Sequence, residues 1–290
     1  MMERIFTIVA PLFVVVLVAY LYGRTRQPSM GIVNKINMEV FIPALIFSVM
    51  ARDSFQPGQY VMLAIAAMGV ILGSGLLAWI ASRLLGWQWR TLVPPMMFSN
   101  WGNLGIPLFV FAWGEESLGA AVVLFVTGNV LWFTVGRALL SGSLSIAEVV
   151  KSPILCAVFL GLLFSSLNWS VPEVIDVPLE MLGRVAIPLM LFSLGVRLTA
   201  LCWEDWRYGV VGAVLCPTAG VLSAWLLTLV LPLDPLQQKQ VLLLGVLPPA
   251  VMNFVFAEEF DQEPDKVASI VMVANIMSMV TIPVLLFFIL

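Results

Sequence analysis

The chain has 290 residues, of which 61% are hydrophobic and only 11% are charged, and its mean hydropathy is +1.04. Soluble domains carry about 25% charged residues, so this composition excludes a soluble enzyme and a disordered chain. The net charge of −3 offers no basic surface for nucleic acid, and the absence of histidine excludes His-based zinc sites and proton relays.

Apolar segments long enough to span a bilayer follow one another along the chain, since a spanning helix needs about 20 mostly apolar residues. The segments are residues 5–22, 30–50, 60–85, 91–113, 117–140, 152–167, 178–200, 208–231, 239–260 and 265–290. They predict an all-α integral membrane protein with ten transmembrane helices in one unit, residues 1–290. We interpret residues 1–22 as part of the first span rather than a signal peptide, because they lack a small-residue cleavage site.

Lysines and arginines predict the orientation of these spans. Ten lie in or beside loops that follow odd-numbered helices: Arg24, Arg26, Lys35, Arg83, Arg90, Arg137, Lys151, Arg197, Arg207 and Lys266. Four lie at the N-terminus or beside even-numbered loops: Arg4, Arg52, Arg184 and Lys239. We therefore predict a multi-pass protein of the plasma membrane, with odd-numbered loops in the cytoplasm and both termini outside.

The two halves of the sequence resemble each other. Residues 42–48 (IPALIFS) match residues 187–193 (IPLMLFS) at a constant offset of 145 positions. The other matches are Pro94 and Pro95 with Pro248 and Pro249, and Asn129 with Asn275. Since each half has five helices, an odd number, the second half must enter the membrane inverted, as in many secondary transporters. We predict repeat one at residues 1–140 and repeat two at residues 150–290.

Charged residues inside the second and seventh segments predict either salt bridges or an ion site. Lys35 and Glu39 lie four residues apart, and Glu180 and Arg184 occupy the matching positions with the signs exchanged. Charges inside membrane spans are costly and are usually paired. Each of these has a partner within reach, so we favour salt bridges, and a proton or ion relay around Glu39 stays open.

Helix-breaking residues are concentrated at mid-membrane depth in the fourth and ninth segments. The fourth segment holds Ser99, Asn100, Gly102, Asn103, Gly105 and Pro107, and the ninth holds Pro248, Pro249 and Asn253. Irregular backbone at this depth is tolerated only where protein or a wet cavity surrounds it. Broken spans at matching places in two halves point to a transport site, so we predict that these two helices cross there.

The predicted site binds the carboxylate of a small organic anion. In this interpretation Asn100 and Asn253 donate hydrogen bonds, Asn103 and Ser99 line the site, and Asn129 and Asn275 support it from adjacent helices. Gly102, Gly105, Pro107, Pro248 and Pro249 keep the helices broken. The freed helix N-termini add about half a positive charge each, so no buried lysine or arginine is required.

Three segments, the fourth, the seventh and the ninth, carry a family resemblance. Residues 100–108 (NWGNLGIPL), followed by 113–117 (WGEES), resemble the fourth-helix signature of the auxin efflux carrier family. Residues 247–248, 254–260 and 264–265 are similar to its ninth helix, and residues 191–195 to its seventh. The family includes plant auxin exporters and bacterial permeases for malonate- or malate-like dicarboxylates. The plant carriers have prolines where this chain has Ser99 and Asn253, so its crossover is built differently from theirs.

The resemblance implies a division of labour among the ten helices. Helices 3–5 and 8–10 would form a mobile transport domain, and helices 1, 2, 6 and 7 a scaffold that forms a homodimer through helices 2 and 7. The transport domain would carry substrate across by alternating access of the elevator type. Membrane lipid would surround the protein.

The predicted function is therefore secondary transport of a small organic anion. An enzyme is not expected, because no HExxH, GxSxG or paired intramembrane carboxylates occur. The alternatives are a sodium-coupled carrier similar to bile-acid symporters, a channel, and a receptor without coupled transport. No cofactor or metal is expected, since Cys156, Cys202 and Cys216 are scattered; the substrate, the coupling ion and the direction of transport stay open.

Overall fold

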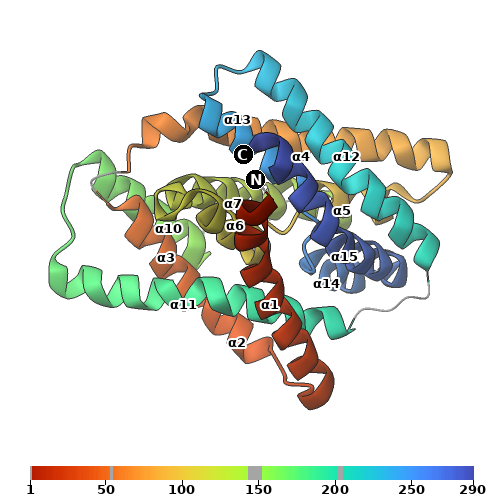
Figure 1. The fold of residues 1–290 in the computed structure, drawn as a ribbon, viewed down its shortest axis with the longest axis horizontal. Helices are drawn as coiled ribbons and strands as arrows, with labels where there is room; N and C mark the ends of the chain where they lie inside the picture. Colours follow the sequence, from red (N-terminus) through yellow and green to blue (C-terminus); the bar gives the residue numbers. More distant parts are fainter. Residues whose placement is uncertain (1, 53–54, 143–151, 201–204) are drawn as a thin grey trace.

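The structure is a computed structural model that describes residues 2–52, 55–142, 152–200 and 205–290, and within these ranges every regular element is a helix (Figure 1). Lys151 and Cys202, considered above, lie outside the described residues. The first half contains α1 (Met2–Arg26), α2 (Gly31–Ile36), η1 (Asn37–Phe41), α3 (Ile42–Met50), α4 (Pro57–Leu85), α5 (Trp89–Met97), η2 (Trp101–Gly105), α6 (Ile106–Trp113), η3 (Glu115–Ser117), α7 (Leu118–Leu131), η4 (Trp132–Gly136) and α8 (Arg137–Ser141). The second half contains α10 (Pro153–Ser166), α11 (Glu173–Arg197), η5 (Leu198–Ala200), α12 (Trp206–Val230), α13 (Pro235–Val246), α14 (Met252–Glu259) and α15 (Pro264–Ile289).

Helix ends coincide with residues that start or stop helices. Pro57 occupies the first turn of α4, and Gly86 ends that helix in the left-handed conformation, with φ of 68°. Before α13, the side chain of Asp234 accepts a hydrogen bond from the backbone N–H of Gln237. The side chain of Gln237 in turn accepts a hydrogen bond from the backbone N–H of Asp234. The predicted segments end within a few residues of the observed helix ends, where these local signals stop the helices.

Seven helices within the described ranges are long and apolar enough to cross a membrane. Two shorter apolar helices, Trp101–Trp113 and Pro153–Ser166, correspond to parts of the predicted fourth and sixth spans. The all-helical membrane class is thus confirmed, and the count of ten spans stays a prediction.

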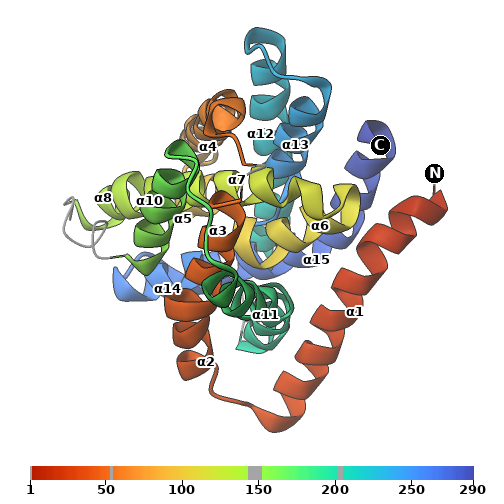
Figure 2. The ribbon, with the colours of Figure 1, turned by 90° about the vertical axis from the view of Figure 1, so that its left-hand side faces the viewer.

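Helices of the two halves pack in matching pairs. Between the halves, α1 packs on α11 and α10 packs on α3 (Figures 1 and 2). Within the halves, α4 packs on α5 and α12 packs on α13. The long helices α4 and α12 also pack on each other. Exchanging the halves therefore exchanges these contacts, and the inverted repeat stays a prediction.

The start of α1 and the end of α15 lie near each other in both views (Figures 1 and 2). Met2 and Phe6 line one wall of an apolar groove whose other wall contains Phe287 and Phe288. Both ends of the described chain thus lie at one apolar groove, and the placement of the termini outside the cell stays a prediction.

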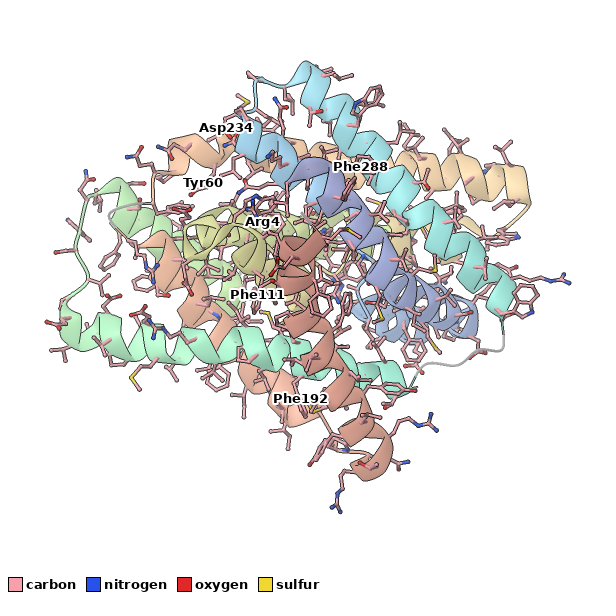
Figure 3. All side chains as sticks on the ribbon, in the orientation of Figure 1. Arg4, Tyr60, Phe111, Phe192, Asp234 and Phe288 are labelled. Carbon is pink, nitrogen blue, oxygen red and sulfur yellow. The ribbon has the colours of Figure 1, made fainter. Side chains whose placement is uncertain are left out.

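Large apolar side chains cover the outside of the molecule (Figure 3). Phe288 on α15 is 77% exposed and Val174 on α11 is 86% exposed. An apolar surface of this extent is unfavourable in water and matches a lipid environment. The protein is therefore a multi-pass membrane protein.

Single cysteines at two exposed positions test the topology. Ser141 ends α8 and Ser170 precedes α11, and one predicted span, the sixth, separates them. In a background without Cys156, Cys202 and Cys216, we expect cysteines at these positions to react with an impermeant maleimide from opposite sides of the membrane. Labelling from the same side would contradict the predicted inverted repeat.

Candidate functional site

The breaks in the predicted fourth and ninth spans are joined by main-chain hydrogen bonds. Helix α5 ends at Met97 and η2 begins at Trp101, whereas α13 ends at Val246 and α14 begins at Met252. Between them Ser99 and Pro249 form an isolated antiparallel bridge. The structure thus brings the two broken spans into direct contact.

The hydrogen bonds of this bridge come from residues beside Pro249, which has no N–H to donate. The N–H of Asn100 donates to the carbonyl of Pro248 at 2.7 Å, and the N–H of Ala250 donates to the carbonyl of Phe98 at 3.0 Å. Backbone groups freed by the breaks are therefore satisfied across the two halves, as burial requires.

Asn253 supports the bridge with its amide nitrogen. That nitrogen donates to the carbonyls of Phe98 and Ala250, both at 2.8 Å, and Asn253 is only 4% exposed. Its buried Oδ1 atom has no hydrogen-bond partner among the described residues. This differs from the role expected from sequence, in which Asn253 donates to substrate, because the free end of the amide is an acceptor.

In Asn100 the group without a partner is the amide nitrogen, a donor, whereas in Asn253 it is the amide oxygen, an acceptor. The Asn100 side chain is 3% exposed, and its Nδ2 atom is buried without a hydrogen-bond partner in the described part of the chain. A buried amide donor without a partner costs about 1–3 kcal/mol, so it marks a place where a ligand or water is needed.

The two supporting asparagines differ in what they contact. The amide nitrogen of Asn275 on α15 donates to the carbonyl of Pro249 at 3.0 Å and to that of Val271 at 2.8 Å. Asn129 on α7 donates instead within its own helix, to the carbonyl of Phe125 at 2.8 Å. Asn275 therefore holds the second break directly, and Asn129 contributes only as part of the cavity wall.

A cavity of about 300 Å³ lies against the bridge. Its wall includes seven of the residues singled out from sequence: Lys35, Ser99, Asn100, Gly102, Asn103, Asn129 and Asn253. Gly105 and Pro107 lie just beyond it, where the N–H of Gly105 donates to the carbonyl of Asn100 at 2.9 Å and Pro107 starts α6. Residues of α2, η1, α3 and α11 complete the wall, so the cavity lies between the predicted transport and scaffold helices.

Arg197 is a site residue that sequence reasoning missed. It ends α11, is partly buried, and lines the cavity. Its Nη1 contacts the sulfur of Met252 at 2.9 Å, and no carboxylate of the described residues forms an ion pair with it. The interpretation from sequence placed no arginine at the site, and the structure places one in the cavity wall. The available signal was its position four residues after Ser193, on the same helix face.

Lys35 marks the place where the cavity reaches the surface, because it lines the cavity while 72% of its side chain is exposed. Its Nζ lies 4.0 Å from the Oε1 of Glu39. Beside it, the hydroxyl of Ser193 on α11 donates to the Oδ1 of Asn34 on α2. No Asp or Glu of the described residues is part of the cavity wall, so its two charged side chains, Lys35 and Arg197, are both cationic.

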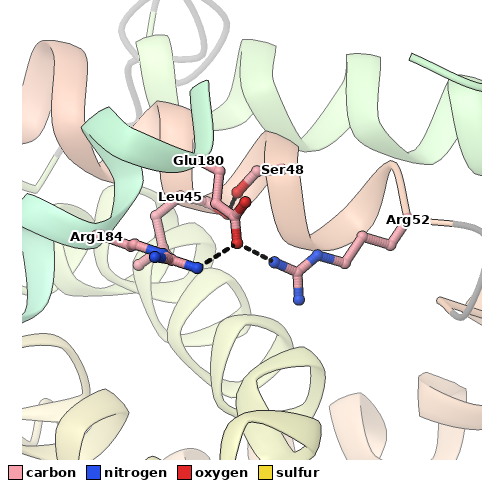
Figure 4. A network of polar contacts seen from close by, with 5 residues as sticks. All are labelled: Leu45, Ser48, Arg52, Glu180 and Arg184. Carbon is pink, nitrogen blue, oxygen red and sulfur yellow. Dashed lines mark hydrogen bonds and ion pairs between the residues drawn. The ribbon is translucent and has the colours of Figure 1, made fainter. Parts of the chain in front are cut away.

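Glu180 on α11 contacts Arg52, which follows the end of α3, outside the cavity (Figure 4). Its Oε1 lies 3.0 Å from Nη2 of Arg184 and 3.3 Å from Nη2 of Arg52. The expected pairs, Lys35 with Glu39 and Glu180 with Arg184, are thus both present, and Arg52 is an additional partner. We interpret this group as structural.

Neutralising Glu180 is expected to be more harmful than neutralising Glu39. Glu180→Gln leaves two guanidinium groups without their carboxylate, so we expect a loss of about 1 kcal/mol in the free energy of unfolding. Glu39→Gln breaks one exposed pair and is expected to cost less than about 0.5 kcal/mol. Thermal unfolding in detergent measures both, and a larger loss for Glu39→Gln would contradict the assignment.

A second polar cluster joins α5 to α15 away from the cavity. Glu263 accepts hydrogen bonds from Thr91 on α5 and from Lys266. Partial burial raises the pKa of the Glu263 carboxyl, but the hydrogen bonds from Lys266 and Thr91 outweigh that effect and hold its pKa below the ordinary value. Glu263 is therefore ionised at neutral pH, and we assign it a structural role.

The fold and this site define a multi-pass helical membrane protein with a polar cavity between two broken spans. A family model described as "Membrane transport protein" matches residues 4–146 and 137–286. The chain belongs to that family, the auxin efflux carrier family, which confirms the resemblance seen in its motifs.

Two relatives match over nearly their whole length. A protein of Rhizobium meliloti (strain 1021) named "Putative malonate transporter" is 23% identical, over 99% of this chain and 97% of the relative. A protein of Methanocaldococcus jannaschii named as an uncharacterized transporter is 22% identical, over 95% of this chain and 96% of the relative. Both names agree with a membrane transport protein.

Proposed function

We propose that this protein is a secondary transporter that moves a small organic anion across the plasma membrane by alternating access at the bridge between its two broken spans. The cavity carries this proposal: it is lined by an unpaired amide donor and two cations, and by no carboxylate of the described residues. The partly buried guanidinium of Arg197 is costly unless an anion or water compensates its charge.

Access from one side supports the alternating mechanism. The cavity reaches the surface at Lys35, beside the loop between α1 and α2 that the lysine and arginine pattern places in the cytoplasm. Ile46, Ile106 and Val122, on α3, α6 and α7, are each 0% exposed, and none of them is part of the cavity wall. We infer an inward-facing conformation, in which substrate exchanges with the cytoplasm.

The substrate we propose is a small dicarboxylate. A second, ionised group on the substrate would have Arg197 as its partner, and the name of the Rhizobium relative agrees with this class. A sodium-coupled mechanism similar to bile-acid symporters is less well supported, because hard cations prefer carboxylate and carbonyl oxygens and no Asp or Glu of the described residues faces the cavity.

A homodimer through α2, η1, α3 and α11 remains part of the proposal. Exposed apolar side chains on these helices, Ile32 at 74% and Met181 at 67%, offer a surface for a second copy or for lipid. Movement of α4–α8 and α12–α15 against this scaffold would be the elevator step. No cofactor is required by this cycle.

Replacing Asn100 tests the proposal. Asn100→Ala removes a hydrogen bond to a charged or polar ligand, so we expect affinity to fall about ten- to a hundredfold. The matched control is Asn37→Ala, which removes another buried asparagine, 4% exposed, that is not part of the cavity wall.

The measurement is malonate counterflow in proteoliposomes. The parent should show saturable counterflow, the Asn37 variant should retain it, and the Asn100 variant should require more substrate. Flux without saturation would favour a channel, and binding without flux would favour a receptor. Equal affinity in both variants would contradict the site.

A further inference from the structure

Two buried polar atoms beside the bridge lack partners, and they are of opposite kinds. Nδ2 of Asn100 is a donor and Oδ1 of Asn253 is an acceptor, and both residues line the cavity. The orientation of the Asn253 amide is fixed, because its nitrogen already donates to the carbonyls of Phe98 and Ala250. A ligand group that pairs with both atoms must therefore accept a hydrogen bond from Asn100 and donate one to Asn253.

An ionised carboxylate cannot meet this requirement, because it only accepts hydrogen bonds. Placed here, it would satisfy Asn100 and set its negative oxygen against the Oδ1 of Asn253. A protonated carboxyl group has one carbonyl oxygen that accepts and one O–H that donates. Its hydrogen-bonding groups match those of the two asparagines.

We propose that the substrate binds as a monoanion with one protonated carboxyl group, whose carbonyl accepts from Asn100 and whose O–H donates to Asn253. The substrate's second, ionised carboxylate pairs with Arg197, whose guanidinium has only the weak sulfur acceptor of Met252 among the described residues. This inference rests on the proposed function and adds the protonation state. Each transport step then carries one proton on the substrate itself.

The charged groups around the cavity support a proton carried by the ligand. Lys35 and Arg197 are the charged residues of its wall within the described ranges, and no carboxylate of these ranges is part of that wall. No other titratable side chain of the described residues faces Asn100 or Asn253 in the cavity. Glu39 contacts Lys35 from outside this wall, and its Oε1 lies 4.0 Å from the Lys35 Nζ. We assign the pH dependence of binding near neutral pH to the ionisation of the ligand.

Three ligands that differ at one group test the inference on the unmodified protein. Malonate can present a protonated carboxyl group, and its monoamide presents a carbonyl and an N–H donor that does not titrate. Its monomethyl ester presents a carbonyl without a donor. All three keep one ionised carboxylate for Arg197, so differences among them report on the corner formed by Asn100 and Asn253.

The experiment measures dissociation constants for the three ligands between pH 5 and 8, together with counterflow. We expect malonate affinity to fall about tenfold per pH unit above its second ionisation, and monoamide affinity to stay constant. The ester should bind about ten- to a hundredfold more weakly than the monoamide, because it leaves a buried acceptor unpaired.

Two results would overturn the inference while leaving the transporter intact: malonate affinity that is independent of pH, or an ester that binds as tightly as the monoamide. The second would show that water donates to Asn253. If none of the three ligands binds or shows counterflow at any pH, the proposed function itself fails, and the inference fails with it.

Discussion

Arg197→Gln is expected to reduce the affinity for malonate by between about thirtyfold and several thousandfold. Removing one member of a buried, hydrogen-bonded charge pair costs about 2–5 kcal/mol, and Arg197 is the partly buried cation of the cavity wall. Glutamine keeps much of the length and polarity of the side chain, so the fold should tolerate it. Titration calorimetry or a thermal-shift titration on purified protein measures the change.

Lys35→Gln is the matched control for Arg197. It also removes one positive charge from the cavity wall, but the Lys35 side chain is 72% exposed, so its charge is well screened. We expect the affinity to fall less than about fivefold, since an exposed ion pair contributes at most about 1 kcal/mol. Equal losses in the two variants would mean that net charge, rather than a specific contact with Arg197, attracts the anion.

Gly220→Ala is expected to destabilise the protein by about 3 kcal/mol or more. Helices α12 and α13 approach so closely that a Cβ at Gly220 would lie 1.9 Å from the carbonyl oxygen of Gly245. The obstacle is main chain, which cannot rotate away as a side chain could, and overpacking of this kind forces the helices apart. Since α13 leads directly into the second break, we also expect substrate binding to be lost.

Gly58→Ala provides the comparison for Gly220. Gly58 lies in the first turn of α4, and a Cβ added there would meet no atom within 4 Å. We expect its melting temperature to match that of the parent or to rise slightly, because alanine favours helix. A Gly220→Ala protein that unfolds at the same temperature as Gly58→Ala would show that the two helices separate without cost.

Hydropathy predicted most of the fold because membrane spans must be apolar and must satisfy their own backbone. The breaks were visible for the same reason, since prolines and glycines interrupt that rule at positions 94–107 and 248–249. Neither segment alone could predict that the two breaks are in direct contact. Their contact depends on how α5 and α13 are packed against α4 and α12.

Two features of the site depended on three-dimensional contacts. Arg197 lies near the end of the predicted seventh span, residues 178–200, where an arginine ordinarily indicates a cytoplasmic flank. Only the packing of α11 against η2 brings it to the cavity wall. Asn253 was recognisable as an intramembrane amide, but its free end depends on which carbonyls its nitrogen reaches. Composition and spacing cannot supply that information.

The bridge between Ser99 and Pro249 also bears on how substrate preference could be redesigned. Its two hydrogen bonds run between main-chain atoms of Phe98, Asn100, Pro248 and Ala250, so they are independent of the side chains at these positions. Side chains on the cavity wall, such as Ser99, Asn103 and Met252, can therefore be exchanged without dismantling the junction. A library restricted to these three positions should yield folded carriers with altered ligand selectivity.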